Sequence, residues 1–172
     1  MQRRIPITIM RGGTSKGVFF KKQDLPSDLA KQDAVISAAF GSPDPYGRQI
    51  NGLGGATSTT SKVAIINPRA GEPNTIDYTF GQVSIGNNLV DRKGNCGNIS
   101  SAVGPYAVDE GMVEVSGDEA AVRIYNTNTK KYIISRFPLE NGKAKVEGDY
   151  QISGVPGAGA RVSLDFERPG GS

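Results

Sequence analysis

The alternation of apolar and polar residues along the chain predicts mainly β-strands. Residues 5–10 carry isoleucine at every second position, the period expected of a strand with one buried face. Short apolar runs predict more strands, over residues 17–20, 62–66, 75–80, 82–85, 113–115, 121–125, 132–137, 146–152 and 160–166. The turn-forming residues 126–129 should join two of these strands into a hairpin.

Two segments show helical periodicity instead. Ser27 is expected to cap a helix over residues 28–40, which should end at Gly41. A second helix is expected over residues 99–110, where small and apolar side chains recur every three to four positions. Pro105 should bend or shorten this helix, because proline has no amide hydrogen to donate. Together with the strands, the two helices predict an α+β domain.

The chain has 172 residues, the length of one compact domain, and its sequence shows no internal repeat and no linker. Its 23 glycines and 10 prolines indicate many turns. They are dense in residues 42–61, a segment also rich in hydroxyl side chains, for which no regular structure is expected.

Composition excludes several kinds of site. The chain has no histidine and one cysteine, so it cannot by itself build a Ser-His-Asp triad, a Cys-His dyad, a typical zinc site or a disulfide. The net charge of +3 suits an anionic small molecule as well as nucleic acid. Nucleic-acid binding has little support, because the basic residues are scattered and form no run interleaved with aromatic residues.

Targeting signals are also missing from the sequence. The first ten residues contain no apolar core of signal-peptide length, and no apolar run approaches the length of a membrane span. We therefore expect a soluble, cytoplasmic protein whose Cys96 stays reduced.

The cysteine lies in the motif DRKGNCGNIS, residues 91–100, just before the second expected helix. The positive end of a helix dipole favours a thiolate at Cys96. The glycines on either side, Gly94 and Gly97, allow a ligand to approach the backbone closely. The amides of Gly97, Asn98 and Ile99 could then bind a carboxylate. The alternative is a structural cysteine buried in a tight turn.

A second motif, GLGGATSTTSK at residues 52–62, looks at first like a phosphate-binding loop. It does not fit G-x-x-x-x-G-K-[ST], because Lys62 follows Ser61 and precedes Val63. What remains is a loop of amides and hydroxyls, including Gly55, Thr57 and Ser61, that ends in a lysine beside an apolar strand. Partial burial lowers the pKa of a lysine and can make it a usable base. A solvated lysine at a strand start is the alternative.

The third motif is MRGGTSKG, residues 10–17, between the first two expected strands. Arg11 could hold a carboxylate with two parallel hydrogen bonds. Thr14 and Ser15 could donate hydrogen bonds to the same group. A purely structural glycine-rich turn is the alternative.

In combination, the three motifs resemble the PrpF family, which includes 2-methylaconitate cis-trans isomerase, 4-oxalomesaconate tautomerase and 3-methylitaconate delta-isomerase. The resemblance rests on MRGGTSKGVFF, SPDPYGRQINGLGGATSTTSKVAI and GNCGN, in family order, and extends along the whole chain. It implies the diaminopimelate epimerase-like fold, in which a sheet or barrel wraps around a central helix. The helix after Cys96 would be that central helix.

The resemblance also implies the chemistry. The family's catalytic lysine and cysteine correspond to Lys62 and Cys96, with Lys62 expected as the base and Cys96 as a partner acid or base. The implied reaction needs no cofactor or metal and moves or reorients a double bond in an aconitate-like di- or tricarboxylate. We expect the acid to contact substrate-binding residues from all three motifs: Arg11, Thr14, Ser15, Gly55, Thr57, Ser61, Gly97 and Asn98.

Length is where the chain departs from the family. Family members continue into a second domain of similar size, whereas this sequence stops at PGGS, residues 169–172. Residues 1–172 would therefore be one N-terminal-type domain, which needs either its missing second domain or a second copy of itself. A truncated chain is the favoured reading.

Two other functions remain open at this point. One is a non-catalytic module with the same fold that binds carboxylates or mediates assembly. The other is an amino-acid racemase or epimerase, which normally needs two opposed cysteines.

Overall fold

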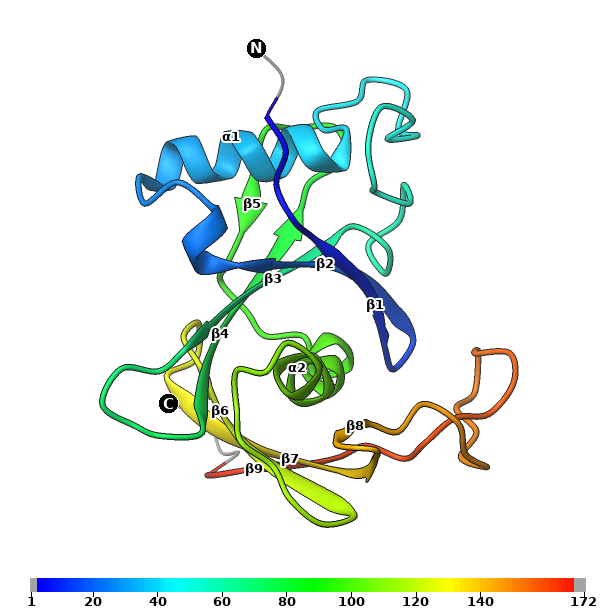
Figure 1. The fold of residues 1–172 in the computed structure, drawn as a ribbon. Helices are drawn as coiled ribbons and strands as arrows, with labels where there is room; N and C mark the ends of the chain where they lie inside the picture. Colours follow the sequence, from blue (N-terminus) through cyan, green and yellow to red (C-terminus); the bar gives the residue numbers. More distant parts are fainter. Residues whose placement is uncertain (1–2, 169–172) are drawn as a thin grey trace.

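The computed structural model describes residues 3–168, so the terminal PGGS noted above lies outside the described residues. The strands of the described part form one curled mixed sheet, and two α-helices pack against it (Figure 1). The helices are α1 (Leu29–Phe40) and α2 (Gly97–Asp109), and a short 3-10 turn, η1 (Lys22–Asp24), precedes α1. The strands are β1 (Thr8–Gly12), β2 (Ser15–Lys21), β3 (Lys62–Pro68), β4 (Thr75–Val83), β5 (Val90–Asp91), β6 (Glu119–Asn126), β7 (Lys131–Glu140), β8 (Lys143–Ala144) and β9 (Ser163–Phe166).

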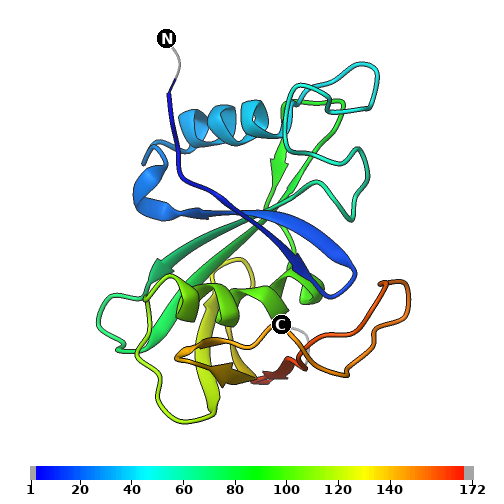
Figure 2. The ribbon, with the colours of Figure 1, turned by 45° about the vertical axis from the view of Figure 1, so that its right-hand side comes forward.

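The sheet runs in the order β1-β2-β3-β4-β6-β7-β8, with β5 added to β4 and β9 added to β7. Neighbouring strands are antiparallel except for the pairs β2–β3 and β4–β6. The sheet curls so far that strands lie on several sides of α2, which Figure 1 shows end-on and Figure 2 shows from the side. The sheet and α2 thus form a barrel-like half shell around a central helix, as the resemblance implied.

Alternation along β2 and β3 divides the core into two clusters. Val18 and Val63 point toward α1 and belong to the smaller cluster. Phe19 and Ala64, one residue further along each strand, point toward α2 and belong to the larger cluster. The strands β2, β3 and β4 are therefore covered on both faces, which explains their nearly continuous apolar runs.

Helix α2 is the centre of the larger cluster. Eight of its residues are buried: Ile99, Ser100, Ala102, Val103, Gly104, Tyr106, Ala107 and Val108. A Cβ built on Gly104 would lie 2.6 Å from Oγ of Ser135 and 2.8 Å from a ring carbon of Phe137, so glycine lets the helix lie directly on β7. Pro105 does not end the helix, which continues to Asp109. Packing of α2 against the core on several sides stabilises the helical conformation there.

Most predicted strands are confirmed, with shifted ends. The expected strands 75–80 and 82–85 are one continuous strand, β4, in which Gly81 keeps the extended course. A Cβ at Gly81 would lie 2.7 Å from side-chain carbons of both Val63 and Val90, so glycine is needed there for close packing. Strands β5 and β8 have two residues each, too few to produce a recognisable pattern.

Two predicted strands are wrong. Residues 113–115 follow α2 without joining the sheet, and the amide of Glu114 donates instead to the side chain of Asn74. Residues 146–152 make only an isolated bridge between Tyr150 and Gly159, and the chain turns just after them at Gly154 and Gly157, both at positive φ. Both segments have strand-like composition, but neither finds a neighbouring strand to pair with.

The start of α1 is corrected by one residue. Asp28, and not Ser27, is the N-cap, and its carboxylate accepts a hydrogen bond of 2.9 Å from the amide of Lys31. The predicted stop is confirmed, since Gly41 closes the helix in the left-handed conformation at φ 75°.

Within residues 3–168, no helix combines the length and the apolar character that a membrane span requires. The same residues contain no group of three or more Asp, Glu, Cys or His side chains that could hold a metal ion. The expected cytoplasmic location stays a prediction.

The contact of α2 with β7 can be tested by substituting Gly104. We expect Gly104→Ala to lower the free energy of unfolding by about 1–3 kcal/mol, because the new methyl group overpacks the contact with Ser135 and Phe137. Gly86→Ala is the matched control, since a Cβ there meets no atom within 4 Å. Urea denaturation measures both variants, and equal stability of the two would contradict the close helix–strand contact.

Candidate functional site

The tip of the β1–β2 hairpin rests on the first turn of α2. A Cβ on Gly12 would collide with the carbonyl oxygen of Asn98, and one on Gly13 would collide with its side-chain oxygen. Gly13 also has φ 51°, a conformation that residues with a side chain rarely adopt. The amide of Thr14 donates a 3.3 Å hydrogen bond to Oδ1 of Asn98. The first and third motifs therefore meet through Asn98.

The second motif joins the same hairpin from the other side. The amide of Lys16 donates a 2.9 Å hydrogen bond to the carbonyl of Thr59. In the sheet, Gly17 of β2 lies opposite Lys62 of β3. All three motifs thus meet around the start of β2, although Thr14 and Asn98 are 84 residues apart in the sequence.

Lys62 points toward α2, since it alternates with Ala64, which packs in the cluster around that helix. The residue is only 9% exposed. Its ammonium group donates a 2.9 Å hydrogen bond to Oε1 of Gln82 and lies 5.3 Å from the ring centre of Phe80. Within residues 3–168, no carboxylate forms an ion pair with Lys62. A neutral amide and an aromatic face therefore hold this buried amine.

Cys96 is the N-cap residue of α2. It is partly buried and packs against the cluster around α2, to which Phe80 also belongs. Its side chain makes no capping hydrogen bond. The thiol therefore does not cap the amides of the first helical turn. Lys62 and Cys96 thus both contact the core cluster around α2.

A buried polar network lies behind Cys96. The hydroxyl of Ser100 is 2.9 Å from the carbonyl oxygen of Cys96 and 3.1 Å from Oδ1 of Asn95. The side-chain amide of Asn126, which is fully buried, donates a 3.0 Å hydrogen bond to the same Asn95 oxygen. These bonds tie the chain on either side of Cys96 to the end of β6.

Three of the expected binding residues share a cavity of about 320 Å³. Arg11, Gly97 and Asn98 line it together with Tyr150, which lies in the loop between β8 and β9. One guanidinium nitrogen of Arg11 donates to the carbonyl of Gly13, at 2.9 Å. Neither Lys62 nor Cys96 lines this cavity. The remaining lining residues are Met10, Gly13, Ser101, Ala102, Pro105, Ile152, Ala160 and Val162.

The other expected binding residues are occupied by contacts within the protein. The hydroxyl of Ser61 is fully buried, donates to the carbonyl of Val83 and accepts from Gln49, both at 2.9 Å. The hydroxyl of Thr57 lies within 2.9 Å of those of Thr59 and Thr60. Gly55 packs against the side chain of Thr60, and Ser15 is buried at the start of β2. Their roles in substrate binding stay predictions.

Gln49 orders the loop that leads into Lys62, and no sequence pattern signals it. It is 1% exposed and has the unusual φ of 50°. Its side-chain amide nitrogen donates to the hydroxyls of Ser42 and Ser61, and its oxygen accepts from the amide of Ala56, all at 2.9 Å. Residues 42–61 are therefore irregular, as expected, but built around one buried glutamine.

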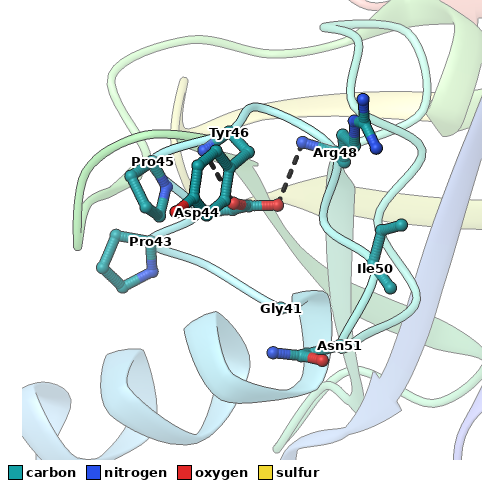
Figure 3. Close-up of a pocket in the computed structure, with 8 residues that line it drawn as sticks. All are labelled: Gly41, Pro43, Asp44, Pro45, Tyr46, Arg48, Ile50 and Asn51. Carbon is teal, nitrogen blue, oxygen red and sulfur yellow. Dashed lines mark hydrogen bonds between the residues drawn. The ribbon is translucent and has the colours of Figure 1, made fainter.

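The largest cavity lies away from these residues, at the loop 41–51 (Figure 3). Its volume is about 600 Å³, and none of the expected site residues lines it. The carboxylate of Asp44 accepts hydrogen bonds from the amides of Tyr46 and Arg48, drawn as dashed lines in Figure 3. These bonds, that of Tyr46 above all, lower the pKa of Asp44. Asp44 thus serves to shape the loop.

Comparison with known proteins gives a consistent result. The family model described as "PrpF protein" matches residues 2–172. A 3-methylitaconate isomerase of Eubacterium barkeri is 52% identical over 99% of this chain and 44% of its own length. A 2-methyl-aconitate isomerase of Cupriavidus necator is 47% identical over 98% of this chain and 44% of its own length. The chain therefore spans about half the length of the curated relatives it matches.

A solved structure shows the same fold. The crystal structure of a methylitaconate-delta-isomerase superposes with a TM-score of 0.91 at 52% identity, over 95% of this chain and 42% of that chain. The expected diaminopimelate epimerase-like fold is confirmed.

The role of Gln49 leads to a test. We expect Gln49→Leu to lower the free energy of unfolding by at least about 2 kcal/mol, because it leaves buried hydroxyl and amide groups without partners. Trypsin should also cut after Arg48 faster than in the wild type. Gln151→Leu, a change at an exposed glutamine, is the control. Unchanged stability and cleavage in Gln49→Leu would refute this role.

Proposed function

The chain belongs to the PrpF family, and from this premise we propose that it forms one half of a cofactor-independent isomerase. The proposed reaction moves or reorients a C=C bond in an unsaturated, aconitate-like di- or tricarboxylate. One observation carries the proposal: Lys62 and Cys96 contact the same core cluster beside the uncapped first turn of α2. The relatives named above as isomerases of methylitaconate and methyl-aconitate support this substrate class.

In the proposed reaction, a substrate carboxylate binds at the first turn of α2, where backbone amides and the helix dipole favour an anion. The neutral amine of Lys62 removes an allylic proton, and the thiol of Cys96 returns a proton at the other end of the allylic system. Proton number is conserved, because one group gains the proton that the other loses. The neutral partner Gln82 suits this role, since a carboxylate partner would hold Lys62 as the ammonium ion.

A second half is part of the proposal. Neither Lys62 nor Cys96 lines the cavities described above, so this half alone supplies only one wall of the proposed site. We propose that a second domain of similar size, or a second copy of this chain, supplies the opposite wall. Excluding water there would strengthen the electrostatic contacts to the substrate.

A carboxylate-binding module without catalysis is the second candidate. The cavity that contains Arg11 favours it, because that cavity combines a guanidinium group and helix amides with apolar walls but excludes both Lys62 and Cys96. The two candidates differ in whether a bound acid exchanges hydrogen with solvent.

Exchange in deuterated water separates them. We expect the chain, once a second half or a second copy supplies the opposite wall, to incorporate deuterium into methylitaconate or methylaconitate, detected by NMR. Cys96→Ala and Lys62→Met should each slow incorporation at least about hundredfold, because each removes a proton-transfer group. Lys145→Met, at a lysine on the surface, is the control. Binding of the acid without any incorporation would support the module, and equal rates in all variants would reject the residue assignment.

A further inference from the structure

One stretch of β4 has no strand beside it on one edge. The strand β3 pairs with one edge of β4 along residues 76–82. On the other edge, residues 75–78 pair with β6 and residues 82–83 pair with β5. Within the described part of the chain, residues 79–81 have no strand partner on that edge. The backbone of Phe80, in the middle of this gap, therefore needs hydrogen-bond partners of another kind.

The side chain of Asn128 fills the gap. Asn128 lies in the turn between β6 and β7. Its carboxamide oxygen accepts a 2.8 Å hydrogen bond from the amide of Phe80, and its nitrogen donates a 2.9 Å bond to the carbonyl of the same residue. The nitrogen donates a second bond, of 2.7 Å, to the carbonyl of Arg92. One carboxamide thus takes the place of a strand residue and uses both of its donors.

Both partners of this carboxamide lead to the proposed proton-transfer groups. Phe80 and Gln82, two residues apart in β4, hold the ammonium group of Lys62 through a ring face and an amide oxygen. Arg92 is four residues before Cys96 in the chain. The carboxamide therefore joins the strand that holds the amine to the segment that carries the thiol.

The same turn also holds the other end of that segment. The amide nitrogen of Asn126 donates a 3.0 Å hydrogen bond to Oδ1 of Asn95, the residue before the cysteine. The side-chain oxygen of Asn126 accepts from the amide and the hydroxyl of Thr129, at 2.8 and 3.0 Å, and these bonds close the turn. Residues 92–95 are thus bonded to one turn at both ends.

We propose that Asn128 is a positioning residue that fixes the distance between Lys62 and Cys96. No covalent bond is made or broken in this role. The turn acts as a common support for both groups, and a misplacement of about 1 Å between reacting groups can cost about 10²-fold in rate. The inference deepens the proposed function and rests on it, since it assumes that these two side chains transfer the proton.

Closing the turn does not explain the asparagine at position 128, because Asn126 provides that closure. The three bonds of Asn128 need one acceptor and two donors on a short side chain. An aspartate carboxylate has no donor, and a glutamine would carry its amide one methylene group further from the backbone. The chemistry of this side chain therefore matches its two backbone partners.

Alkylation of the thiol tests the bond to Arg92. Cys96 is the only cysteine in the chain, so its alkylation by iodoacetamide at a fixed pH reports this one side chain. We expect Asn128→Leu, which removes three hydrogen bonds at similar volume, to raise the alkylation rate at least about tenfold. The reason is that a partly buried thiol becomes more exposed when the segment before it is released.

Thr127→Val is the matched control. The hydroxyl of Thr127 lies 3.3 Å from the carbonyl oxygen of Tyr78 and 2.6 Å from the hydroxyl of Thr79. The change therefore removes hydrogen bonds between the same turn and β4, but none of those that Asn128 makes. We expect this variant to be alkylated at the wild-type rate.

The kinetic constants of deuterium incorporation test the role in the reaction. Once a second half or a second copy completes the site, Asn128→Leu should lower kcat by about 10- to 100-fold and leave KM unchanged. The acid would still find its binding groups, while the two proton-transfer groups would no longer be held at the right distance. A merely structural role would leave the kcat of the folded enzyme, like that of Thr127→Val, at the wild-type value.

Asn128→Ser is a second variant, for the case that Asn128→Leu does not fold. The smaller side chain leaves room for water at the freed backbone groups, which preserves the fold but does not join the two segments. It should change the alkylation rate and kcat in the same directions as Asn128→Leu.

The two proposals fail separately. An alkylation rate that stays at the wild-type value in the position-128 variants would overturn the inference. An unchanged kcat in these variants would also overturn it, if Cys96→Ala stops deuterium incorporation. If Cys96→Ala incorporates deuterium at the wild-type rate, the proposed reaction is wrong, and the alkylation rate still decides whether Asn128 holds the segment before the thiol.

Discussion

The burial of α2 is the constraint on which the rest of the structure depends. A helix with small or apolar residues on nearly every side must be covered on nearly every side. The sheet covers the helix because it curls around it. Gly104 lets the helix approach β7 without a side chain between them. A helix enclosed in this way leaves little of its surface for a ligand, and part of what remains lines the cavity that contains Arg11. The N-terminal end, with Cys96 as its first residue, is left uncapped beside the hairpin tip.

The second consequence concerns charge. A buried ammonium group needs polar contacts, and Lys62 obtains them from a neutral amide and an aromatic ring. Cys96 likewise has a buried polar network on its inner side, through Asn95, Ser100 and Asn126. The amine of Lys62 is thus held by neutral partners, and neutral side chains hold the chain on either side of Cys96.

The loop before Lys62 has a structural role beside the binding role that its composition predicts. Its hydroxyl groups suit an anion, and the sequence favoured Thr57 and Ser61 as ligands. In the fold, Ser61 bonds to Gln49 and to β4, while Thr57 bonds to its neighbours in the loop. The internal hydrogen bonds of Ser61 tie the loop to β4 next to the start of β3.

The sequence by itself determined the local structure: two helices, most of the strands, the glycine stop of α1 and the three motifs. These depend on periodicity and turn chemistry, which act between near neighbours in the chain. It could not reject a strand at residues 146–152, since a strand exists only if a partner pairs with it. Nor could it signal Gln49 or Gln82, whose roles arise from contacts with residues distant in sequence. The tertiary structure alone decided that Asn98 joins two motifs and that Lys62 and Cys96 contact one cluster. The physical reason is that only folding brings residues that are distant in sequence into contact.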